Sequence, residues 1–282
     1  MAHPMQYVID PRIIGTDDAQ KAKDACKYDA IDLDMEAREI KFPAGAVIWA
    51  TGWQPYDAAK IQPYGYDRFD NVITNVEFER MADPKGPTGG KLVRKDGKEA
   101  KNVAFIQCAG SRDRNHLYHC SRICCMASLK QTHYVVDAYD DAKVTIYYID
   151  IRAIDRFEDF YQTVKDMDNV TFTKSKVANV ITDKEGNPIC CGVDTEGYHR
   201  YENAHDLVVL ATGMEPSVAK SDFPVDIVIN REGFIEPDAA NGGVFAAGSA
   251  SDALDVNRAV QHATGAALKA IQVVNRVAGA EA

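Results

Sequence analysis

The sequence lacks the features that would place it in a membrane or on a nucleic acid. No apolar run reaches the ~18 residues of a membrane-spanning helix, and no charged-then-apolar signal segment opens the chain. Acidic residues (42) outnumber basic ones (32), which gives a net charge of −10 at pH 7. Phosphate binding draws on a basic surface, so this charge argues against a nucleic-acid partner. We expect a cytoplasmic protein with no direct membrane span.

Glycine-rich nucleotide-binding motifs are also missing. The chain contains no GxGxxG pattern. The segment PKGPTGGK (84–91) is not a phosphate loop, because Leu92 follows where that loop requires Ser or Thr. With 46% hydrophobic and 26% charged residues over 282 positions, the chain still has the composition of an ordinary globular protein of one or two domains.

Seven cysteines are present, and their distribution is uneven. Four of them lie in QCAGSRDRNHLYHCSRICC: Cys108, Cys120, Cys124 and Cys125. An odd number of cysteines without an export signal argues against a disulfide framework and favours metal binding or redox chemistry. Cys190 and Cys191 are adjacent on a predicted strand and point to opposite faces, so we interpret them as structural, and Cys26 as a core residue.

Two stretches of the sequence repeat each other: VIWATGWQP (47–55) and VVLATGMEP (208–216). Each is an apolar strand followed by Ala-Thr-Gly, two further residues and a proline. Each also follows a polar, turn-rich piece (30–42 and 192–206) that predicts a small β-meander before a buried strand.

Between and after the repeats, apolar strands alternate with helices. The predicted strands are 102–108, 143–151, one or two within 170–183, and 242–247; the predicted helices are 121–139, 157–167 and one from 256 onward. This alternation implies an α/β fold with a parallel sheet covered on both faces. Residues 59–100 are rich in Gly, Pro, Asp and Lys and predict a linker and surface excursion.

The paired ATG strands, closed by a VFAAG strand and a helix, resemble the flavoprotein disulfide-reductase superfamily, in which two dinucleotide-binding folds are interleaved. FIQCAGSRD and CSRICCMASLK narrow the resemblance to the A subunit of heterodisulfide reductase. PMQYVIDPRIIGT, YDAIDLDM and VIWATGWQPYD resemble the A subunits of the quinone-interacting membrane-bound oxidoreductase complex of sulfate reducers. The resemblance covers nearly the whole chain.

This resemblance implies an interleaved, two-dinucleotide-binding-domain fold that is N-terminally incomplete, since the family opens with GxGxxG. Residues 1–58 and 208–282 would form the remaining part of an FAD-binding domain. Residues 101–207 would form a second dinucleotide-like domain that carries the cysteines, with 59–100 as the linker. A truncated chain, a split gene and a misplaced start would each explain the missing motif, and we expect weakened flavin binding and an exposed sheet edge that needs a partner.

The resemblance also implies that the four clustered cysteines bind a [4Fe-4S] cluster. Three of them fall at the start of a predicted helix, where free N–H groups and the helix dipole favour an anionic group. Nearby cations offset this charge or lie solvated on the surface: Arg112, Arg114, Arg122 and Lys130. Tetrahedral zinc on the same sulfurs, with His116 or His119 as a substitute ligand, is the alternative.

For the flavin, the resemblance implies contacts from two glycine turns and one helix start: Thr51, Gly52, Gly248, Ser249, Val256, Asn257 and Arg258. Ser249 stands where the family has an acid for the ribityl chain, which is a departure. The positive helix end would stabilise a reduced, anionic flavin. We interpret Gly213 of the second ATG as a domain-crossing turn.

Asp150 follows the strand TIYYI, where an acid would hold an adenosine ribose. Only Gly110 remains of the glycine cradle that a pyrophosphate requires, because the cysteine segment replaces the rest. We therefore expect no binding of NAD(P)H and interpret Asp150 as a solvated or capping carboxylate.

The implied function is that of an oxidoreductase subunit that relays electrons between FAD and a [4Fe-4S] cluster in a quinone-linked complex of dissimilatory sulfate reduction. The implied partners are adenylylsulfate reductase and two members of the same complex: a sister flavin/iron-sulfur subunit, and a haem-bearing membrane subunit through which the chain would reach the membrane. No pattern predicts acid–base or nucleophilic catalysis.

Two other functions stay open at this point. One is a thioredoxin-reductase-like dithiol oxidoreductase that uses Cys120/Cys124 or Cys124/Cys125, although the C-x-x-C and C-x4-C spacings of those enzymes are absent. The other is a zinc-bearing structural or interaction module.

Overall fold

The computed structural model describes residues 9–36, 39–218, 227–236 and 242–280, and the chain divides into two compact units, residues 1–44 and 45–282. The first unit contains the 3-10 helix η1 (Pro11–Ile13) and helix α1 (Asp17–Ala25). The hydroxyl of Thr16 accepts a hydrogen bond from the Ala19 N–H (3.4 Å) and so caps α1.

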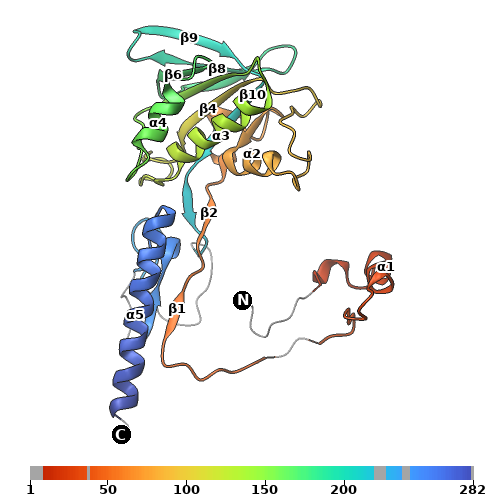
Figure 1. Ribbon diagram of the computed structural model, residues 1–282, viewed down its shortest axis with the longest axis vertical. Coiled ribbons are helices and arrows are strands. Elements are labelled where there is room, and N and C mark those ends of the chain that lie inside the picture. The colour runs from red at the N-terminus through yellow and green to blue at the C-terminus, as the bar shows by residue number, and fades with distance from the viewer. Residues whose placement is uncertain (1–8, 37–38, 219–226, 237–241, 281–282) are drawn as a thin grey trace. The chain divides into compact units, whose positions relative to one another are not determined.

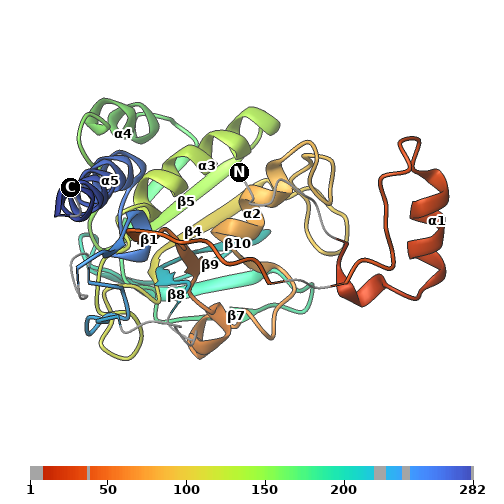
Figure 2. The same cartoon turned by 90° about the horizontal axis from the view of Figure 1, so that it is seen from below.

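A five-stranded parallel sheet forms the centre of the second unit, with the strand order β3-β10-β4-β5-β6 (Figures 1 and 2). Its strands are β3 (Val72–Thr74), β4 (Asn102–Ala109), β5 (Lys143–Tyr148), β6 (Val170–Lys174) and β10 (Leu207–Thr212). Helix α2 (Asn75–Ala82) follows β3, while α3 (Cys124–Ala138) joins β4 to β5 and α4 (Glu158–Lys165) joins β5 to β6. The predicted parallel α/β sheet is confirmed.

Both faces of this sheet are covered, as its continuous apolar strands require. On one face, Phe105 and Val209 pack with Leu129 of α3. On the other face, Ile106 and Leu210 pack beneath a three-stranded antiparallel sheet. Its strands are β7 (Asn179–Thr182), β8 (Pro188–Asp194) and β9 (His199–Ala204).

The β7–β9 sheet confirms the second predicted meander, but the first one is wrong. The described residues of 30–42 contain no strand, and residues 37–38 lie outside the described part. Most of the described side chains of this segment are exposed, and short strands are unstable without a buried face.

A buried polar contact joins the meander to the central sheet at His205. Its Nε2 lies 3.1 Å from Tyr147 Oη, and its Nδ1 lies 3.1 Å from Asn102 Oδ1. The Tyr147 ring also stacks on Tyr201, with 5.2 Å between centroids. Burial lowers the pKa of His205 to about 4, so the folded protein holds this imidazole neutral.

We expect His205 to make the stability of the protein depend on pH. Below the unfolded-state pKa of ~6.5, the unfolded chain takes up a proton that the folded chain refuses until pH ~4. Stability is therefore complete above pH ~6.5 and decreases by about 3 kcal/mol as the pH falls to ~4. Urea unfolding at several pH values checks this. His205→Asn should flatten the profile, whereas the same change at the exposed His199 should leave it unaltered.

Two further parallel strands form a separate small sheet, and among the described residues they have no hydrogen-bonded neighbour in the main sheet. β1 (Val47–Trp49) pairs with β12 (Val244–Ala246), and the long helix α5 (Val256–Ala280) packs on them (Figure 1). Between this pair and the main sheet, β2 (Trp53–Pro55) pairs antiparallel with β11 (Met214–Pro216). The second halves of the two sequence repeats thus meet as neighbouring strands.

Two segments lie elsewhere in the fold than the predicted domain limits imply. The linker 59–100 contains β3 and α2, where Thr74 and Glu77 form a capping box. Residues 208–212, expected in the flavin part, belong to the fully buried strand β10, which pairs with β3 and β4. The other limits stay a prediction. Residues 1–8, 37–38, 219–226, 237–241 and 281–282 of the predicted flavin part lie outside the described residues.

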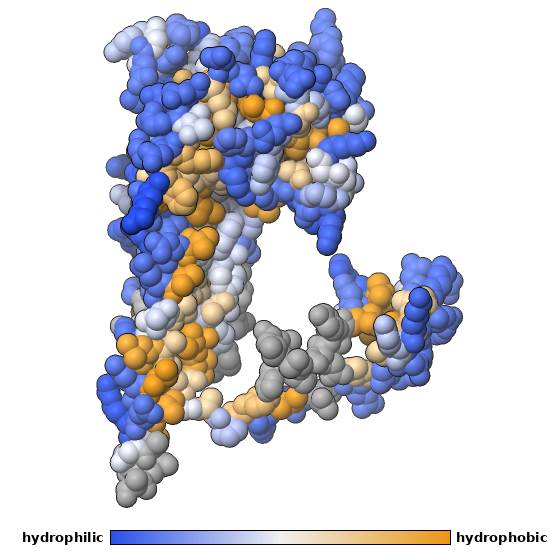
Figure 3. Space-filling model, viewed as in Figure 1, coloured by the Kyte–Doolittle hydropathy of each residue, from blue (hydrophilic) through white to orange (hydrophobic). Residues whose placement is uncertain are grey.

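Apolar side chains remain exposed on α5 and β1, where orange atoms gather in Figure 3. They are Val47, Ile48, Val256, Val260, Leu268, Ile271, Val274 and Val277. One stripe of α5 is covered instead, since Ala266, Ala270 and Val273 pack on Phe245 of β12. Within the described ranges, no helix has the length and apolarity to cross a membrane.

Candidate functional site

The cysteine segment begins with a tight reversal at the end of β4. Cys108, Gly110 and Arg112 all have a positive φ (+57°, +78° and +56°), which turns the chain back on itself. The reversal is closed by hydrogen bonds from Leu117 N–H to Gly110 O (2.8 Å) and from Arg112 N–H to His119 O (3.0 Å). The loop therefore returns to β4 just before α3 begins.

The four predicted ligand cysteines lie between the end of β4 and the first turn of α3. Cys124 and Cys125 are buried as the first residues of α3, Cys108 and Cys120 are half-buried, and all four are free thiols. Burial is the largest cause that raises the pKa of Cys108 and Cys124, and it raises the pKa of Cys125 to about 11.

This thiol set has the chemistry of a metal-cluster ligand. Thiols with a raised pKa stay protonated at neutral pH, and they ionise when a cation replaces the proton. Four such sulfurs are the donor set of a [4Fe-4S] cluster. Among the described residues, no group of three His, Cys, Asp or Glu side chains is placed to hold a metal ion, and this includes the four cysteines.

Hydrogen-bond donors and one cation surround the sulfurs. The Arg122 N–H donates to Cys120 Sγ (3.4 Å), and Arg112 Nη1 lies 4.0 Å from Cys108 Sγ. No side chain caps the N-terminus of α3 at Ile123, which leaves N–H groups of its first turn available to an anionic group. Lys130 is different, because its ammonium pairs with Glu79 at 2.8 Å. The surroundings of the thiols fit an anionic cluster.

The cysteine loop is docked on the second ATG element. Met214 N–H donates to Ser121 Oγ (2.7 Å), and His119 Nε2–H donates to Met214 O (2.9 Å). A Cβ at Gly213 would clash with Ser111 Oγ and lie 2.9 Å from Ser121 Oγ, so only glycine permits this approach. Gly213 was predicted as a crossing turn; its packing against the cysteine loop could not be inferred from the sequence.

The two histidines of the loop each use one ring nitrogen away from the thiols. His116 Nδ1 lies 2.9 Å from Tyr56 Oη, and His119 Nε2 bonds Met214 O. His119 Nδ1 is buried and has no hydrogen-bond partner. The structure thus gives both histidines a role in fixing the loop.

Asp150, at the end of β5, is held by two guanidinium groups. Its carboxylate pairs with Arg112 and, at 3.5 Å, with Arg152 Nε. The acid at the position expected to bind a ribose therefore already has cationic partners. This arrangement links Asp150 to the cysteine site through Arg112.

The predicted flavin contacts lie at the ends of β1 and β12. Because these strands are parallel and pair Trp49 with Ala246, the turns at Gly52 (φ +74°) and Gly248 (φ +60°) follow neighbouring strand ends. Ser217 Oγ donates to Thr51 O (2.8 Å), which ties the first turn to the end of β11. Ser249 lies in the short 3-10 helix η4 (Gly248–Ala250).

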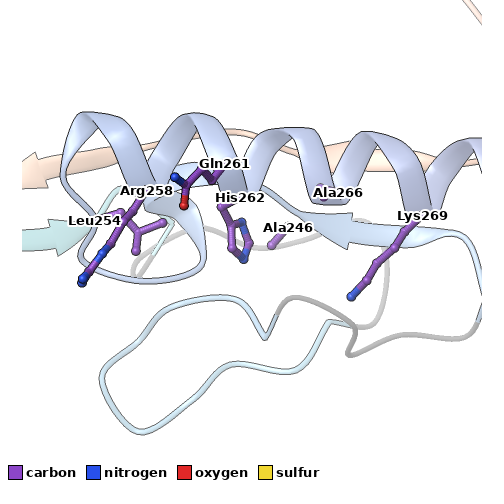
Figure 4. A pocket seen from close by; sticks show the side chains of 8 residues that line it. Ala246, Leu254, Arg258, Gln261, His262, Ala266 and Lys269 are labelled. Atoms are coloured by element: carbon purple, nitrogen blue, oxygen red, sulfur yellow. The ribbon is translucent and has the colours of Figure 1, made fainter.

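Along α5 the structure has a cavity of ≈ 440 Å³ (Figure 4). Its lining residues are Ala246, Leu254, Arg258, Gln261, His262, Gly265, Ala266 and Lys269. Of the three predicted residues at the helix start, Arg258 lines this cavity, while Val256 is exposed and Asn257 Nδ2 lies 3.4 Å from Asp155 Oδ2. Sequence reasoning missed Gln261 and His262. Their spacing of three and four residues from Arg258 on one helix face was the available signal.

Comparison with known proteins relates the chain to one group of reductase subunits. No protein-family model matches it. It is 39% identical over 285 residues to the A subunit of the ferredoxin/F420H2-dependent CoB-CoM heterodisulfide reductase of Methanosarcina acetivorans, which covers 96% of this chain and 35% of that protein. It is 36% identical over 256 residues to the second iron-sulfur A subunit of the CoB–CoM heterodisulfide reductase of Methanopyrus kandleri, covering 86% of this chain and 39% of the relative.

The chain therefore spans little more than a third of the length of these relatives. Among solved structures, thioredoxin reductase of T. acidophilum has a TM-score of 0.50 at 15% identity, with 83% of this chain and 66% of that protein covered. This likeness concerns the fold alone and confirms the predicted two-dinucleotide-binding-domain, disulfide-reductase architecture.

Proposed function

This chain belongs to the family of heterodisulfide reductase A subunits, and from that relationship we propose that it is an oxidoreductase subunit that transfers electrons between FAD and a [4Fe-4S] cluster. Cys108, Cys120, Cys124 and Cys125 would hold the cluster. The turns at Gly52 and Gly248, with Ser249 and the first two turns of α5, would form part of a flavin site. A bound flavin would exchange electron pairs and a cluster single electrons.

One observation carries this proposal: the paired strands β2 and β11 link the two candidate sites. Cys124 Sγ donates to Thr212 O (3.5 Å), and Ser121 binds the Met214 N–H. Met214 then pairs with Pro55 on β2, directly after the turn at Gly52. The thiol set and the flavin half-site are thus fixed to the same pair of crossing strands, which would keep their separation constant during electron transfer.

The residues of the half-site have separate tasks. The N-terminal end of α5 would supply positive potential, which favours a reduced, anionic flavin. Arg258 lines the cavity and pairs with Asp255 at 3.7 Å. Gly52 offers backbone that no side chain covers, since a Cβ built there meets no atom within 4 Å. Gln261 and His262 add polar groups to a cavity floored by alanine and glycine.

We further propose that the chain acts in a quinone-linked complex of dissimilatory sulfate reduction in the cytoplasm. Its partners would be adenylylsulfate reductase and two members of the complex, namely a sister flavin/iron-sulfur subunit plus a haem-bearing membrane subunit. The support is the sequence resemblance to the complex of sulfate reducers, together with the exposed apolar side chains on β1 and α5, which offer a surface for association. Co-purification of these partners with the tagged chain from a sulfate-reducing host tests this assignment.

NAD(P)H is not among the proposed partners. Asp150 pairs with Arg112 and Arg152, and the cysteine loop occupies the position of a glycine cradle. Saturable binding of NADH or NADPH at micromolar concentration would contradict this part of the proposal.

The first experiment is anaerobic purification followed by analysis of iron, sulfide, zinc and flavin, with EPR after dithionite reduction. We expect about four iron and four sulfide per chain and a reduced-cluster signal. Stoichiometric zinc without sulfide would replace the proposal with a structural module. Thiol–disulfide turnover without iron would instead favour the dithiol reductase.

A further inference from the structure

The residue before Cys108 carries a buried side chain with no partner. Gln107 is 5% exposed, and neither its Nε2 nor its Oε1 has a hydrogen bond. A buried amide is nearly always paired in a folded protein, so a pair of unpaired atoms calls for a partner that binds there.

The topology places Gln107 on the face of β4 that α3 covers. Side chains alternate along β4, so Gln107 shares a face with Phe105, which packs against Leu129 of α3. Figure 2 shows α3 lying over β4 and β5. Because α3 joins two parallel strands, it runs opposite to β4, and its first turn lies level with the last residues of the strand. That first turn holds Cys124 and Cys125.

A second unpaired group supports a polar ligand at this interface. Ser128 Oγ, one turn farther along α3, is also buried without a partner. By contrast, Gln131 is equally buried, but its Nε2 donates to Asn75 O (2.9 Å) and Glu79 Oε2 (3.0 Å). Gln107 and Ser128 thus lie unpaired near the cysteine end of α3, while Gln131 Oε1 and His133 Nε2 are unpaired farther along the helix.

We propose that the Gln107 Nε2–H group donates a hydrogen bond to a sulfur of the cluster and so raises its reduction potential. Reduction adds negative charge to the cluster, so a neutral donor in a buried site stabilises the reduced form more than the oxidised form. This inference rests on the proposed iron-sulfur function and adds a specific residue that tunes it.

The test is a potentiometric EPR titration of the wild type, Gln107→Leu and Gln131→Leu. Loss of one hydrogen bond to a charged group should weaken the electron affinity about tenfold, which for a one-electron couple lowers the midpoint by about 59 mV. Gln131→Leu removes an equally buried amide whose donors bind elsewhere, and it should keep the wild-type midpoint. Equal midpoints in all three proteins would overturn the inference.

The deciding result of a second measurement comes from the wild-type protein. In wild-type protein with 15N in its glutamine side chains, pulsed EPR of the reduced cluster should show hyperfine coupling to one amide nitrogen. The coupling should persist in labelled Gln131→Leu. A cluster without this coupling would overturn the inference alone, whereas a wild type without iron or sulfide would overturn the proposed function beneath it.

Discussion

Replacing Cys124 by serine is expected to abolish cluster binding while the fold is kept. Cys124 is the most buried of the four thiols, and a hydroxyl does not replace a thiolate as an iron ligand. The new hydroxyl would still donate to Thr212 O, as Sγ does at 3.5 Å. Iron and sulfide should fall from about four per chain to near zero, and the reduced-cluster EPR signal should disappear.

Cys190→Ser is the matched control for this loss. Cys190 is also buried, on β8, but it lies in the core beneath the meander and not in the thiol set. We expect this variant to lose stability, because it buries a hydroxyl, and to retain its iron. If both serine variants lost iron to the same extent, the loss would reflect damage to the fold, and Cys124 would not be a ligand.

Replacing Gly110 by alanine is expected to destabilise the protein strongly and open the cysteine loop. Gly110 has φ +78°, and a Cβ there would lie 2.5 Å from Tyr56 Cδ1 and 3.2 Å from Ile61 Cδ1. Backbone strain of about 1 kcal/mol adds to an overpacking cost of about 1–3 kcal/mol. Urea unfolding should show a loss of about 2–4 kcal/mol. The iron content should fall as well, because Tyr56 holds His116 of the loop.

Gly97→Ala separates the two causes. Gly97 has a similar φ of +83°, but no atom lies within 4 Å of a Cβ built there. This variant should lose only the strain contribution of about 1 kcal/mol and keep its iron. If Gly110→Ala were no more destabilised than Gly97→Ala, the contact with Tyr56 would be looser than the structure shows.

Some structural differences from the sequence expectations share one physical origin. β3 has only three residues, too few to show a periodicity of its own, and it forms as a strand by pairing with β10. Conversely, residues 30–42 alternate like strands, but their described part contains no strand. Short strands depend on long-range pairing, which no local pattern encodes.

Some features of the candidate site follow from the local sequence, and others depend on the fold. The positions of Cys108, Cys120, Cys124 and Cys125 follow from local features, since a strand end and a helix start lie next to each other in the sequence. The sequence does not reveal the unpaired amide of Gln107 or the close packing of Gly213 on Ser111, because each depends on atoms from a different element.

The sequence by itself therefore determined the α/β alternation, the two ATG repeats and the set of candidate sulfur ligands, because periodicity, turns and residue spacing are properties of neighbouring residues. Only the tertiary structure decided which strands pair, that β2 and β11 cross between the two sites, and that Gln261 and His262 line a cavity with Arg258. Those features come from packing between segments that are distant in the sequence, where burial of side chains on both partners selects one arrangement.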